Sequence, residues 1–370
     1  MTQYIYQEKK WPKFSWDDRE LVPLLGNARN MQGRLIGKME AIGFPLGEEA
    51  VIGIMTADAI KSSEIEGEKL NREQVRSSVA RHLGIEIPDM IPSDRNTDGV
   101  VEMLIDASQR YAEPLTKERL WDWHLSLFAE KPSWKKITVG NWRTDENGPM
   151  QVVSGPIGKE TVHYQAPAAS EISSEMEMFL EWLNEENQED ETDSVIKAGI
   201  AHLWFLTIHP FDDGNGRIAR AVTDMMLARS DKSPFRYYSM SVQIQIDRNA
   251  YYEILEKTQK GTLDITEWLK WFLICLERAI AATEDILKSV FRKYDFWKKY
   301  DGIALNDRQK YMITKLLNDF EGKLKSSKWA KMTKCSQDTA LRDITDLMEK
   351  GILKKEEGGG RSTNYELADF

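Results

Sequence analysis

Cysteine is scarce in this sequence of 370 residues, in which Cys275 and Cys335 are the two present. They lie far apart and belong to no CxxC pair or Cys/His cluster, which excludes a disulfide framework and a cysteine-based zinc site. The N-terminal segment lacks a basic start followed by an apolar run, so we expect no signal peptide. The most apolar stretch, which begins at Trp268, is interrupted by Lys270 and Glu277 and is too short to cross a bilayer. These absences predict a cytoplasmic protein with no membrane contact.

The sequence also lacks a phosphate-binding loop of the GxxxxGK[ST] type, which excludes an ordinary P-loop NTPase. The run GGGRST near the C-terminus has neither the lysine nor a following helix, and we interpret it as a turn. The net charge is −10, so no general electrostatic attraction favours nucleic acid or an anionic membrane. Residues 303–370 differ from the rest because they carry 13 basic and 11 acidic side chains.

Apolar residues recur mostly at intervals of three and four, which predicts a mainly α-helical fold. The expected helices cover residues 21–41, 48–66, 97–111, 116–128, 172–185, 194–208, 214–229, 248–260, 265–294, 306–319, 326–333 and 336–350. A β-hairpin is predicted within residues 149–167, where two β-prone runs flank SGPIGK. The last three helices are followed by two short strands, the pattern of a winged helix-turn-helix. We therefore expect domains at residues 1–94, 95–300 and 301–370.

Residues 208–220 read IHPFDDGNGRIAR and combine a histidine, two aspartates, an asparagine between glycines and two arginines. A helix that begins at residues 214–216 leaves several N–H groups unpaired at its positive end, which suits an anion. Arg217 and Arg220 lie three apart on that helix and project on the same side. Each can donate paired hydrogen bonds to phosphate oxygens, so this helix start is predicted to bind phosphate.

Two further residues of this stretch fit the same chemistry. Asp213 offers a hard oxygen ligand for Mg²⁺ that is bound mainly through phosphates and one or two carboxylates. His209 ends the preceding helix and can be neutral near physiological pH, as a general base must be. Taken singly, a histidine, an acidic turn and two arginines are commonly structural or solvated. Together in one loop they favour a catalytic phosphate site.

The run HPFDDGNGRIAR matches, position by position, the signature His-Pro-Phe-any-acid-Gly-Asn-Gly-Arg-any-any-Arg, and so resembles the Fic family. Three other stretches agree with the resemblance: GNWR at 140–143, residues 165–184, and the stretch from Tyr251. The resemblance covers about residues 95–290. It implies a Fic helical core between an N-terminal helical domain and the winged helix. Fic enzymes characteristically transfer the AMP part of ATP to a hydroxyl side chain of a protein.

The resemblance implies a role for each residue of the motif. His209 would take the proton from the target hydroxyl as it attacks the α-phosphorus, and Asp213 would hold Mg²⁺ against the nucleotide phosphates. The phosphates would be bound by Gly214, Asn215, Gly216, Arg217 and Arg220. Phe211 is expected to anchor the loop in the core.

The hairpin between Met150 and Tyr164 resembles the Fic flap, which lays a target segment over the active site by strand-like pairing. A structural ribbon without a docking role is the alternative. By family position, Tyr252 lines the adenine pocket and Gln259 bonds the edge of the base. The alternative for Tyr252 is a place in the core.

The run SSEIEG at 62–67 resembles the inhibitory motif of many Fic proteins of the class II type: Ser or Thr, three residues, Glu, and then Gly or Asn. Ser62 and Glu66 share a helix face, and Gly67 is a natural helix end. In the family's pattern Glu66 pairs with Arg220, which withdraws the arginine from the γ-phosphate and prevents attack on the α-phosphate. A second hypothesis is that Glu66 orients a water that removes AMP from a modified target.

A rival hypothesis is a DNA-binding transcriptional regulator that acts through residues 303–370, with an inactive or auxiliary Fic domain. The expected recognition helix at 336–350 carries three aspartates beside one arginine, which is unfavourable for a DNA major groove. We therefore favour a protein-contact or dimerisation module over DNA binding. A homodimer and self-AMPylation stay open, whereas the intact His209 and Asp213 disfavour an inactive nucleotide-binding scaffold. The target protein and the type of its acceptor hydroxyl, Ser, Thr or Tyr, are not specified by the sequence.

Overall fold

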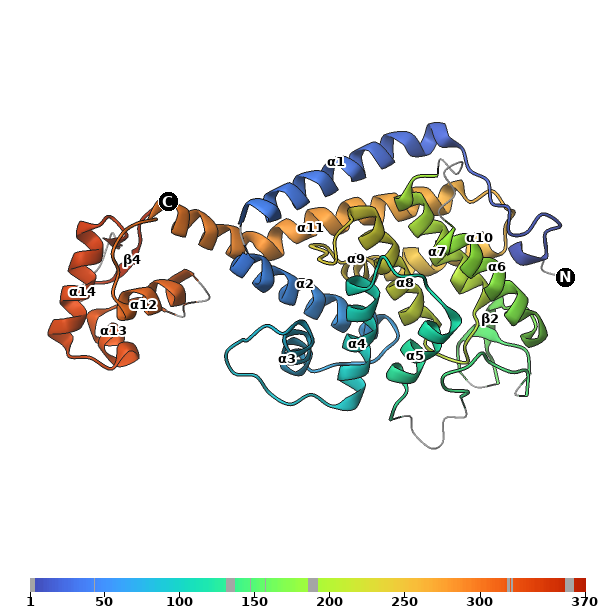
Figure 1. Cartoon of the computed structure of the whole chain (residues 1–370), viewed down its shortest axis with the longest axis horizontal. Coiled ribbons are helices and arrows are strands. Elements are labelled where there is room, and N and C mark those ends of the chain that lie inside the picture. Colours follow the sequence, from blue (N-terminus) through green and yellow to red (C-terminus); the bar gives the residue numbers. More distant parts are fainter. Residues whose placement is uncertain are drawn as a thin grey trace. The chain divides into compact units, whose positions relative to one another are not determined.

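The computed structural model describes residues 4–42, 44–130, 137–146, 148–156, 158–185, 192–317, 320, 322–356 and 363–370. Its contacts divide the chain into two compact units, Met1–Asp285 and Ile286–Phe370. Helices dominate the chain, so the prediction of a mainly α fold is confirmed (Figure 1).

The first unit contains most of the helices. In chain order they are α1 (Asp18–Ile42), α2 (Phe44–Ile65), α3 (Arg72–Leu83), α4 (Arg95–Gln109), α5 (Lys117–Leu127), α6 (Ile172–Asn184), α7 (Ser194–Ile208), α8 (Asn215–Asp231), α9 (Met240–Ile246), α10 (Arg248–Gln259) and the first part of α11 (Thr266–Lys299), with 3-10 turns η1 (Ile5–Gln7) and η2 (Ala169–Glu171). The sequence analysis did not predict α3 or α9.

The centre of this unit is α7 packed against α8. α7 is buried along nearly its whole length, which explains its almost continuous apolar sequence. α6 packs on α7, whereas α4 and α5 pack on α8. α2 contacts both α8 and α9, so the N-terminal helices belong to the same compact unit as the motif. The domain boundary expected at residue 94 therefore falls inside this unit, between α3 and α4.

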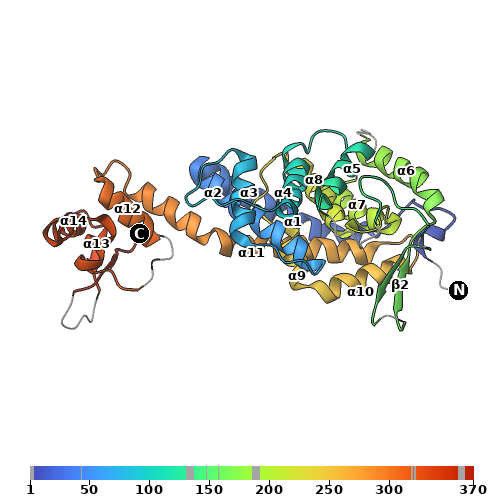
Figure 2. The same ribbon diagram turned by 90° about the horizontal axis from the view of Figure 1, so that it is seen from below.

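Strands β1 (Gln151–Ser154) and β2 (Thr161–Gln165) form the predicted antiparallel hairpin, which Figure 2 shows beside α10. The pairing register is irregular between Val152 and Val153. The residues of β1 are all exposed, whereas Tyr164 on β2 is buried. β1 is thus an edge strand whose backbone has a pairing partner on one side only.

After the end of α11, the described residues of the second unit form three helices and a two-stranded antiparallel sheet, in the order that the sequence predicted. The elements are α12 (Asp307–Leu317), α13 (Ser326–Thr333), α14 (Gln337–Glu349), β3 (Leu353–Lys355) and β4 (Tyr365–Leu367). The assignment of this order of elements to a winged helix stays a prediction.

The core of the second unit includes Trp329, Ile344 and Leu347, together with Phe296 and Tyr300 from the end of α11. The residues of α11 from Ile286 onward therefore belong with the C-terminal helices. A boundary at residue 300, as expected from the change in sequence character, would separate two of these aromatic side chains from their packing partners.

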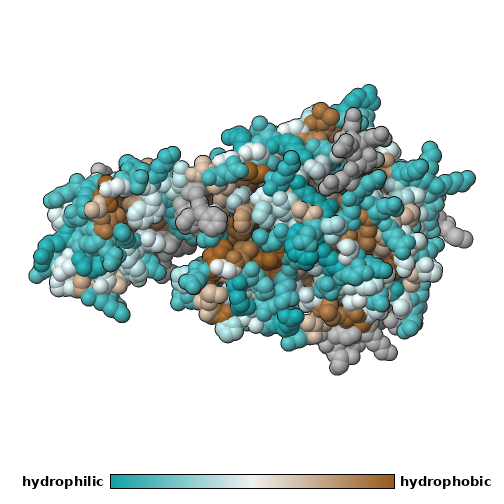
Figure 3. Space-filling view, in the orientation of Figure 1, coloured by the Kyte–Doolittle hydropathy of each residue, from teal (hydrophilic) through white to brown (hydrophobic). Residues whose placement is uncertain are grey.

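Polar side chains cover most of the face shown in Figure 3, and apolar side chains lie in patches between them. Within the described ranges, no helix combines the length and the apolar character that a membrane span requires.

Candidate active site

His209 is the residue at which α7 ends. Its backbone has φ 52° and ψ 59°, the left-handed conformation, and its N–H donates to the carbonyl of Phe205 at 3.0 Å. This conformation is unusual outside glycine and costs on the order of 1 kcal/mol, so the surroundings must stabilise it. It turns the chain sharply and leaves the half-buried imidazole of His209 on the wall of a pocket.

The imidazole of His209 is neutral at physiological pH. Burial lowers its pKa to about 4, against the opposing effect of its contact with Leu206. Nδ1 lies 3.3 Å from the carbonyl oxygen of Leu206, which can only accept a hydrogen bond. Nδ1 therefore carries the proton, and Nε2 has the unprotonated lone pair that a general base needs.

The loop after His209 is fixed by Asn215, the first residue of α8. The side-chain Oδ1 of Asn215 accepts from the N–H of Phe211 at 3.0 Å, and its Nδ2 donates to the carbonyl of Phe211 at 2.8 Å. Phe211 is fully buried, as predicted for a core anchor. The Asn215 amide thus closes the loop, and only its backbone N–H is left to serve the predicted role in phosphate binding.

His124 on α5 also fixes this loop, and the sequence analysis missed it. Its ring stacks on Phe211 with centroids 4.2 Å apart. Nδ1 accepts from the N–H of Gly140 at 3.1 Å, so Nε2 carries the proton and donates to the carbonyl of Asp213 at 3.2 Å. Burial lowers the pKa of His124 to about 4, which keeps the ring neutral and this bonding pattern intact at pH 7.

The start of α8 has the features of an anion site. Gly214, the N-cap, has φ 81°, and its N–H donates to Oδ1 of Asp213 at 2.7 Å. The N–H groups of residues 215–217 have no acceptor within the helix, because the first turn of any helix lacks preceding carbonyls. The structure therefore places a carboxylate beside a cluster of backbone donors.

Two carboxylates line the pocket beside the start of α8. Oδ1 of Asp213 accepts from the N–H of Gly214 and Oδ2 of Asp212 accepts from the N–H of Thr138, each at 2.7 Å, so the assignment of a divalent ion to Asp213 stays a prediction. In the part of the chain that the structure describes, no group of three or more His, Cys, Asp and Glu side chains forms a complete metal site. Mg²⁺ usually keeps most of its ligands from phosphate and water, so the predicted site would need only one or two of these carboxylates.

Arg220 is buried and bonded to the predicted inhibitory motif. Its Nε donates to Oγ of Ser62 at 2.9 Å, and one terminal nitrogen donates both to the Ser62 carbonyl (2.8 Å) and to Oε1 of Glu66 (2.9 Å). The Glu66 carboxylate lies over Gly216, since a Cβ on that glycine would come within 2.9 Å of its Cδ. The carboxylate therefore lies at the N-terminus of α8, where a phosphate is predicted to bind.

Arg217 has an acidic partner that sequence reasoning missed. One terminal nitrogen of its guanidinium donates to Oε2 of Glu68 at 2.7 Å, and the guanidinium lies 5.1 Å from the centre of the Phe128 ring. The Arg217 side chain is 1% exposed, whereas that of Glu68 is 36% exposed. A second glutamate two residues after Glu66 was the signal available in the sequence.

One cavity of about 670 Å³ brings most of these residues together. Its wall includes His209, Asp213, residues 214–216, Glu66 and the whole of β1. The two arginines lie behind this wall, bonded to the glutamates. The predicted base, metal ligand and anion site therefore share one pocket with the edge strand of the hairpin.

The two residues expected at the adenine base also line this cavity. Tyr252 is 38% exposed and has the guanidinium of Arg248 5.6 Å from its ring centre, so it is not a core residue. Gln259 is buried, and its Nε2 donates to the carbonyl of Leu206 at 3.3 Å. Their role toward a base stays a prediction, and the Gln259 amide already has a structural partner.

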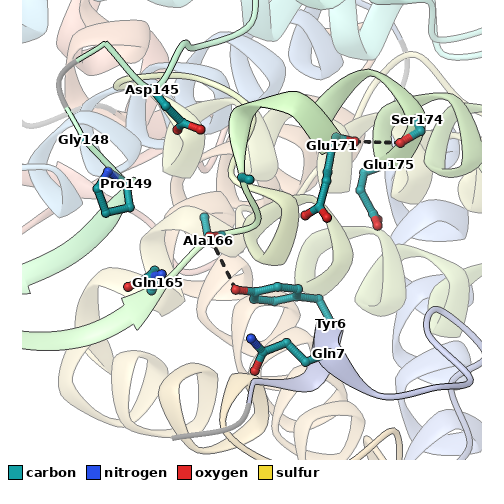
Figure 4. Close-up of a pocket in the computed structure, with 11 residues that line it drawn as sticks. Tyr6, Gln7, Asp145, Gly148, Pro149, Gln165, Ala166, Glu171, Ser174 and Glu175 are labelled. Atoms are coloured by element: carbon teal, nitrogen blue, oxygen red, sulfur yellow. Dashed lines mark hydrogen bonds between the residues drawn. The ribbon is translucent and has the colours of Figure 1, made fainter. Parts of the chain in front are cut away.

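The hairpin is attached to α10 on one side and adjoins a second cavity on the other. His163 of β2 bonds through its ring nitrogens to Oε2 of Glu256 (2.8 Å) and Oγ of Ser154 (2.6 Å). The second cavity, of about 690 Å³, lies next to Pro149 and has Glu175 and Tyr6 on its wall (Figure 4). The hairpin therefore lies between two concave surfaces.

Parts of the chain are similar to known proteins. The Fic/DOC family model matches residues 114–227, and the model of a domain of unknown function, DUF4172, matches residues 4–85. A protein adenylyltransferase Fic from Nematostella vectensis is 33% identical over 116 residues, which is 31% of this chain and 25% of that protein. A protein adenylyltransferase from Caenorhabditis briggsae is 30% identical over 173 residues, 46% of this chain and 31% of that protein.

A solved Fic family protein from Desulfovibrio desulfuricans has a similar fold, with a TM-score of 0.58 at 18% identity, over 95% of this chain and 96% of that one. Residues 114–227 therefore match the Fic/DOC family, and the fold of the chain is similar to that of a solved Fic family protein. The curated relatives match it over only about a quarter to a third of their own length.

Proposed function

We propose that this chain is a protein adenylyltransferase that transfers AMP from ATP to a hydroxyl side chain of a target protein. The curated relatives that carry this activity in their names support the proposal. The observation that carries it is the single pocket in which a neutral imidazole, a carboxylate and the N-terminus of α8 meet. Acid–base chemistry on a phosphate needs this combination of groups.

In the proposed reaction the target hydroxyl oxygen attacks the α-phosphorus of ATP. A new oxygen–phosphorus bond forms, the bond from the α-phosphorus to the bridging oxygen of the β-phosphate breaks, and pyrophosphate leaves. Nε2 of His209 takes the hydroxyl proton, and the N–H groups at the start of α8 stabilise the phosphate oxygens. Mg²⁺ held by Asp213 would neutralise phosphate charge, a role that the donor set fits.

The edge strand β1 is proposed to position the target. It lines the pocket next to His209 and has unpaired backbone groups, which an extended target segment could bond by strand addition. Such pairing would bring one side chain of the segment to the imidazole without requiring a particular target fold.

We further propose that Glu66 and Glu68 inhibit the enzyme together. Glu66 competes with phosphate for the start of α8 and bonds Arg220, while Glu68 bonds Arg217. Both arginines are thereby paired with carboxylates instead of phosphates. Since each glutamate is partly exposed, a nucleotide phosphate can reach and displace it more easily than it could a fully buried acid.

The test is AMP transfer from ATP labelled at the α-phosphate to the proteins of a host-cell lysate. Glu66→Gly should raise labelling roughly 100-fold, the usual effect of one charge-stabilising group, and adding His209→Ala should abolish it. Glu64→Gly is the matched control, because Glu64 ends the same helix but pairs with Lys61. Equal labelling by the natural chain and Glu66→Gly would reject the inhibition, and labelling that survives His209→Ala would reject the mechanism.

A further inference from the structure

Side chains from α10, from β2 and from the segment before β1 bond backbone carbonyls at the end of α7. Gln259 of α10 donates to the carbonyl of Leu206 at 3.3 Å. Tyr164 of β2 donates its hydroxyl to the carbonyl of Thr207 at 2.5 Å. Helix C-termini leave carbonyls without intrahelical partners, and these bonds supply partners in a buried place where water does not. The helix end that carries His209 is therefore fixed from outside.

Arg143 makes the most direct of these contacts. Its Nε donates to the carbonyl of His209 at 2.8 Å, and its own backbone N–H donates to the carbonyl of Pro210 at 2.9 Å. Its side chain is completely buried, and a terminal nitrogen donates to the carbonyl of Pro167 at 2.6 Å. One guanidinium thus bridges His209 and the segment that follows β2.

These bonds matter because His209 is in the left-handed conformation, which a residue with a Cβ adopts only when its surroundings impose it. A relaxed backbone at this position would redirect the imidazole. Bonds to the carbonyls on both sides of that turn, at Thr207 and at His209 itself, oppose such a change.

Tyr164 is well placed to transmit the position of the hairpin. Tyr164 belongs to β2. Its ring packs edge-on against the rings of Tyr4 and Tyr6, with centroid distances of 5.1 Å and 6.3 Å, and this packing restricts its rotamer. Tyr6 in turn contacts the carbonyl of Ala166, as Figure 4 shows. The hairpin and the end of α7 are therefore one bonded unit.

We propose that Arg143 and Tyr164 are positioning residues for His209, which hold the imidazole in its reactive orientation and tie that orientation to the hairpin that receives the target. This inference rests on the proposed function. It assigns to both residues an effect on the chemical step rather than on nucleotide binding, because both side chains bond backbone carbonyls next to the imidazole; Tyr164 lines the same cavity, but its hydroxyl is bonded to Thr207.

The test uses the full chain with Glu66→Gly as the active reference, and adds Tyr164→Phe or Arg143→Gln. Apparent kcat and KM for labelled ATP are measured with a fixed host-cell lysate as acceptor, ATP binding is measured by calorimetry, and folding is checked by the melting temperature. A small misplacement of a catalytic group reduces the rate roughly 10- to 100-fold. We expect kcat to fall by that factor while KM and the Kd for ATP stay within about twofold.

Two further variants serve as controls for the positioning role. Tyr6→Phe keeps the ring that packs on Tyr164 and removes only the 3.5 Å contact of the hydroxyl with the carbonyl of Ala166, so it should leave kcat unchanged. Arg143→Lys keeps the charge but lacks the rigid planar guanidinium that spans the two carbonyls, so it should recover only part of the loss; full recovery would mean that charge alone matters. Unchanged kcat in folded Tyr164→Phe and Arg143→Gln, or an equal loss of ATP binding, would overturn the proposal.

A spectroscopic measurement separates this inference from the proposed function. The imidazole nitrogen shifts of His209, assigned by comparison with His209→Ala, should change in Tyr164→Phe even if the reference protein transfers no AMP. If the reference is inactive and the shifts still change, the positioning role stands and the reaction was misassigned. If the shifts do not change, the positioning role is wrong whatever the activity.

Discussion

Gly216 offers a sharp test of where the inhibitory carboxylate lies. A Cβ added to this glycine would come within 2.9 Å of Cδ of Glu66, closer still to Oε1, and within 3.2 Å of a terminal nitrogen of Arg220. Gly216 is in the first turn of α8 and has an ordinary helical backbone, so alanine is accommodated by the main chain. In Gly216→Ala the carboxylate of Glu66 must therefore move, and its bond to Arg220 breaks.

The magnitude follows from the two opposing effects. A hydrogen bond between charged groups contributes roughly 2 kcal/mol, and the partial exposure of Glu66 places this one at the lower end of the usual range. Replacing glycine by alanine within a helix stabilises by about 0.5 to 1 kcal/mol. We expect Gly216→Ala to destabilise the natural chain by about 1 kcal/mol. In the Glu66→Ala background, where only the end of the Arg220 side chain has to shift slightly, the same change should stabilise by about 0.5 kcal/mol.

The assay is urea unfolding of the natural chain, the two single variants and the double variant, which together give a coupling energy. Gly53→Ala on α2 is the control, because its new Cβ meets nothing within 4 Å and should be additive with Glu66→Ala. A Gly216–Glu66 coupling below about 0.5 kcal/mol, no larger than that of the control, would refute the placement of the carboxylate over the start of α8.

The remaining predictions concern charge. In the Glu66→Gly background, Glu68→Gln should free Arg217 and raise AMP labelling a further few-fold; unchanged labelling would assign Glu68 a structural role only. Because the pKa of His209 is lowered to about 4, the base is lost only as pH falls through that value, so kcat/KM of the active variant should be flat from pH ~6 to ~8 and show no break near ~6.5. Burial lowers the pKa of His202 to about 3. The unfolded chain therefore binds a proton at a higher pH than the folded chain does. The free energy of unfolding should have its full value above pH ~6.5 and should decline below it, and the decline should be less steep in His202→Gln.

The motif site was predictable because its residues are contiguous in sequence. A helix, a sharp turn and a second helix bring His209, Asp213 and the following glycine-flanked asparagine together without help from distant parts of the chain. The bounds of α7 matched the prediction because an uninterrupted apolar run ends at the histidine. The pair of Glu66 and Arg220 came from the resemblance, since nothing in local sequence indicates a contact across 154 positions.

The sequence analysis missed α3 and α9 for identifiable reasons. α3 is mostly polar, but it has Asn71 as N-cap, bonded to two backbone N–H groups, and Gly84 in the left-handed conformation at its end. These capping signals were present and outweigh its weak apolar pattern. α9 reads MSVQIQI, whose alternation is typical of a strand, yet Ser239 caps it and packing against α2 imposes the helix.

The residues that position the site were missed because their roles depend on long-range bonds. Arg143, Tyr164 and His124 each bond a backbone group of the motif segment from at least 43 positions away. A buried side chain that donates to a distant backbone carbonyl produces no recognisable spacing pattern in the sequence. Such contacts exist only once α5, the hairpin and α7 have packed together, which is why the sequence predicted the reactive groups but not what orients them.

The same packing limits how inhibition can be released. α2, which leads into Glu66, is fixed in the core through Asp58, which bonds Ser239 and lies 3.9 Å from the guanidinium of Arg236. Moving the helix as a body would take the buried Asp58 carboxylate away from Ser239 and Arg236, although Arg236 would keep Asp224, and this is more costly than breaking one partly exposed pair. Gly67, in contrast, has φ 83° and follows the helix end directly. The contacts therefore favour a local displacement of residues 66–68, so that phosphate and carboxylate compete for the start of α8 while α2 stays in place.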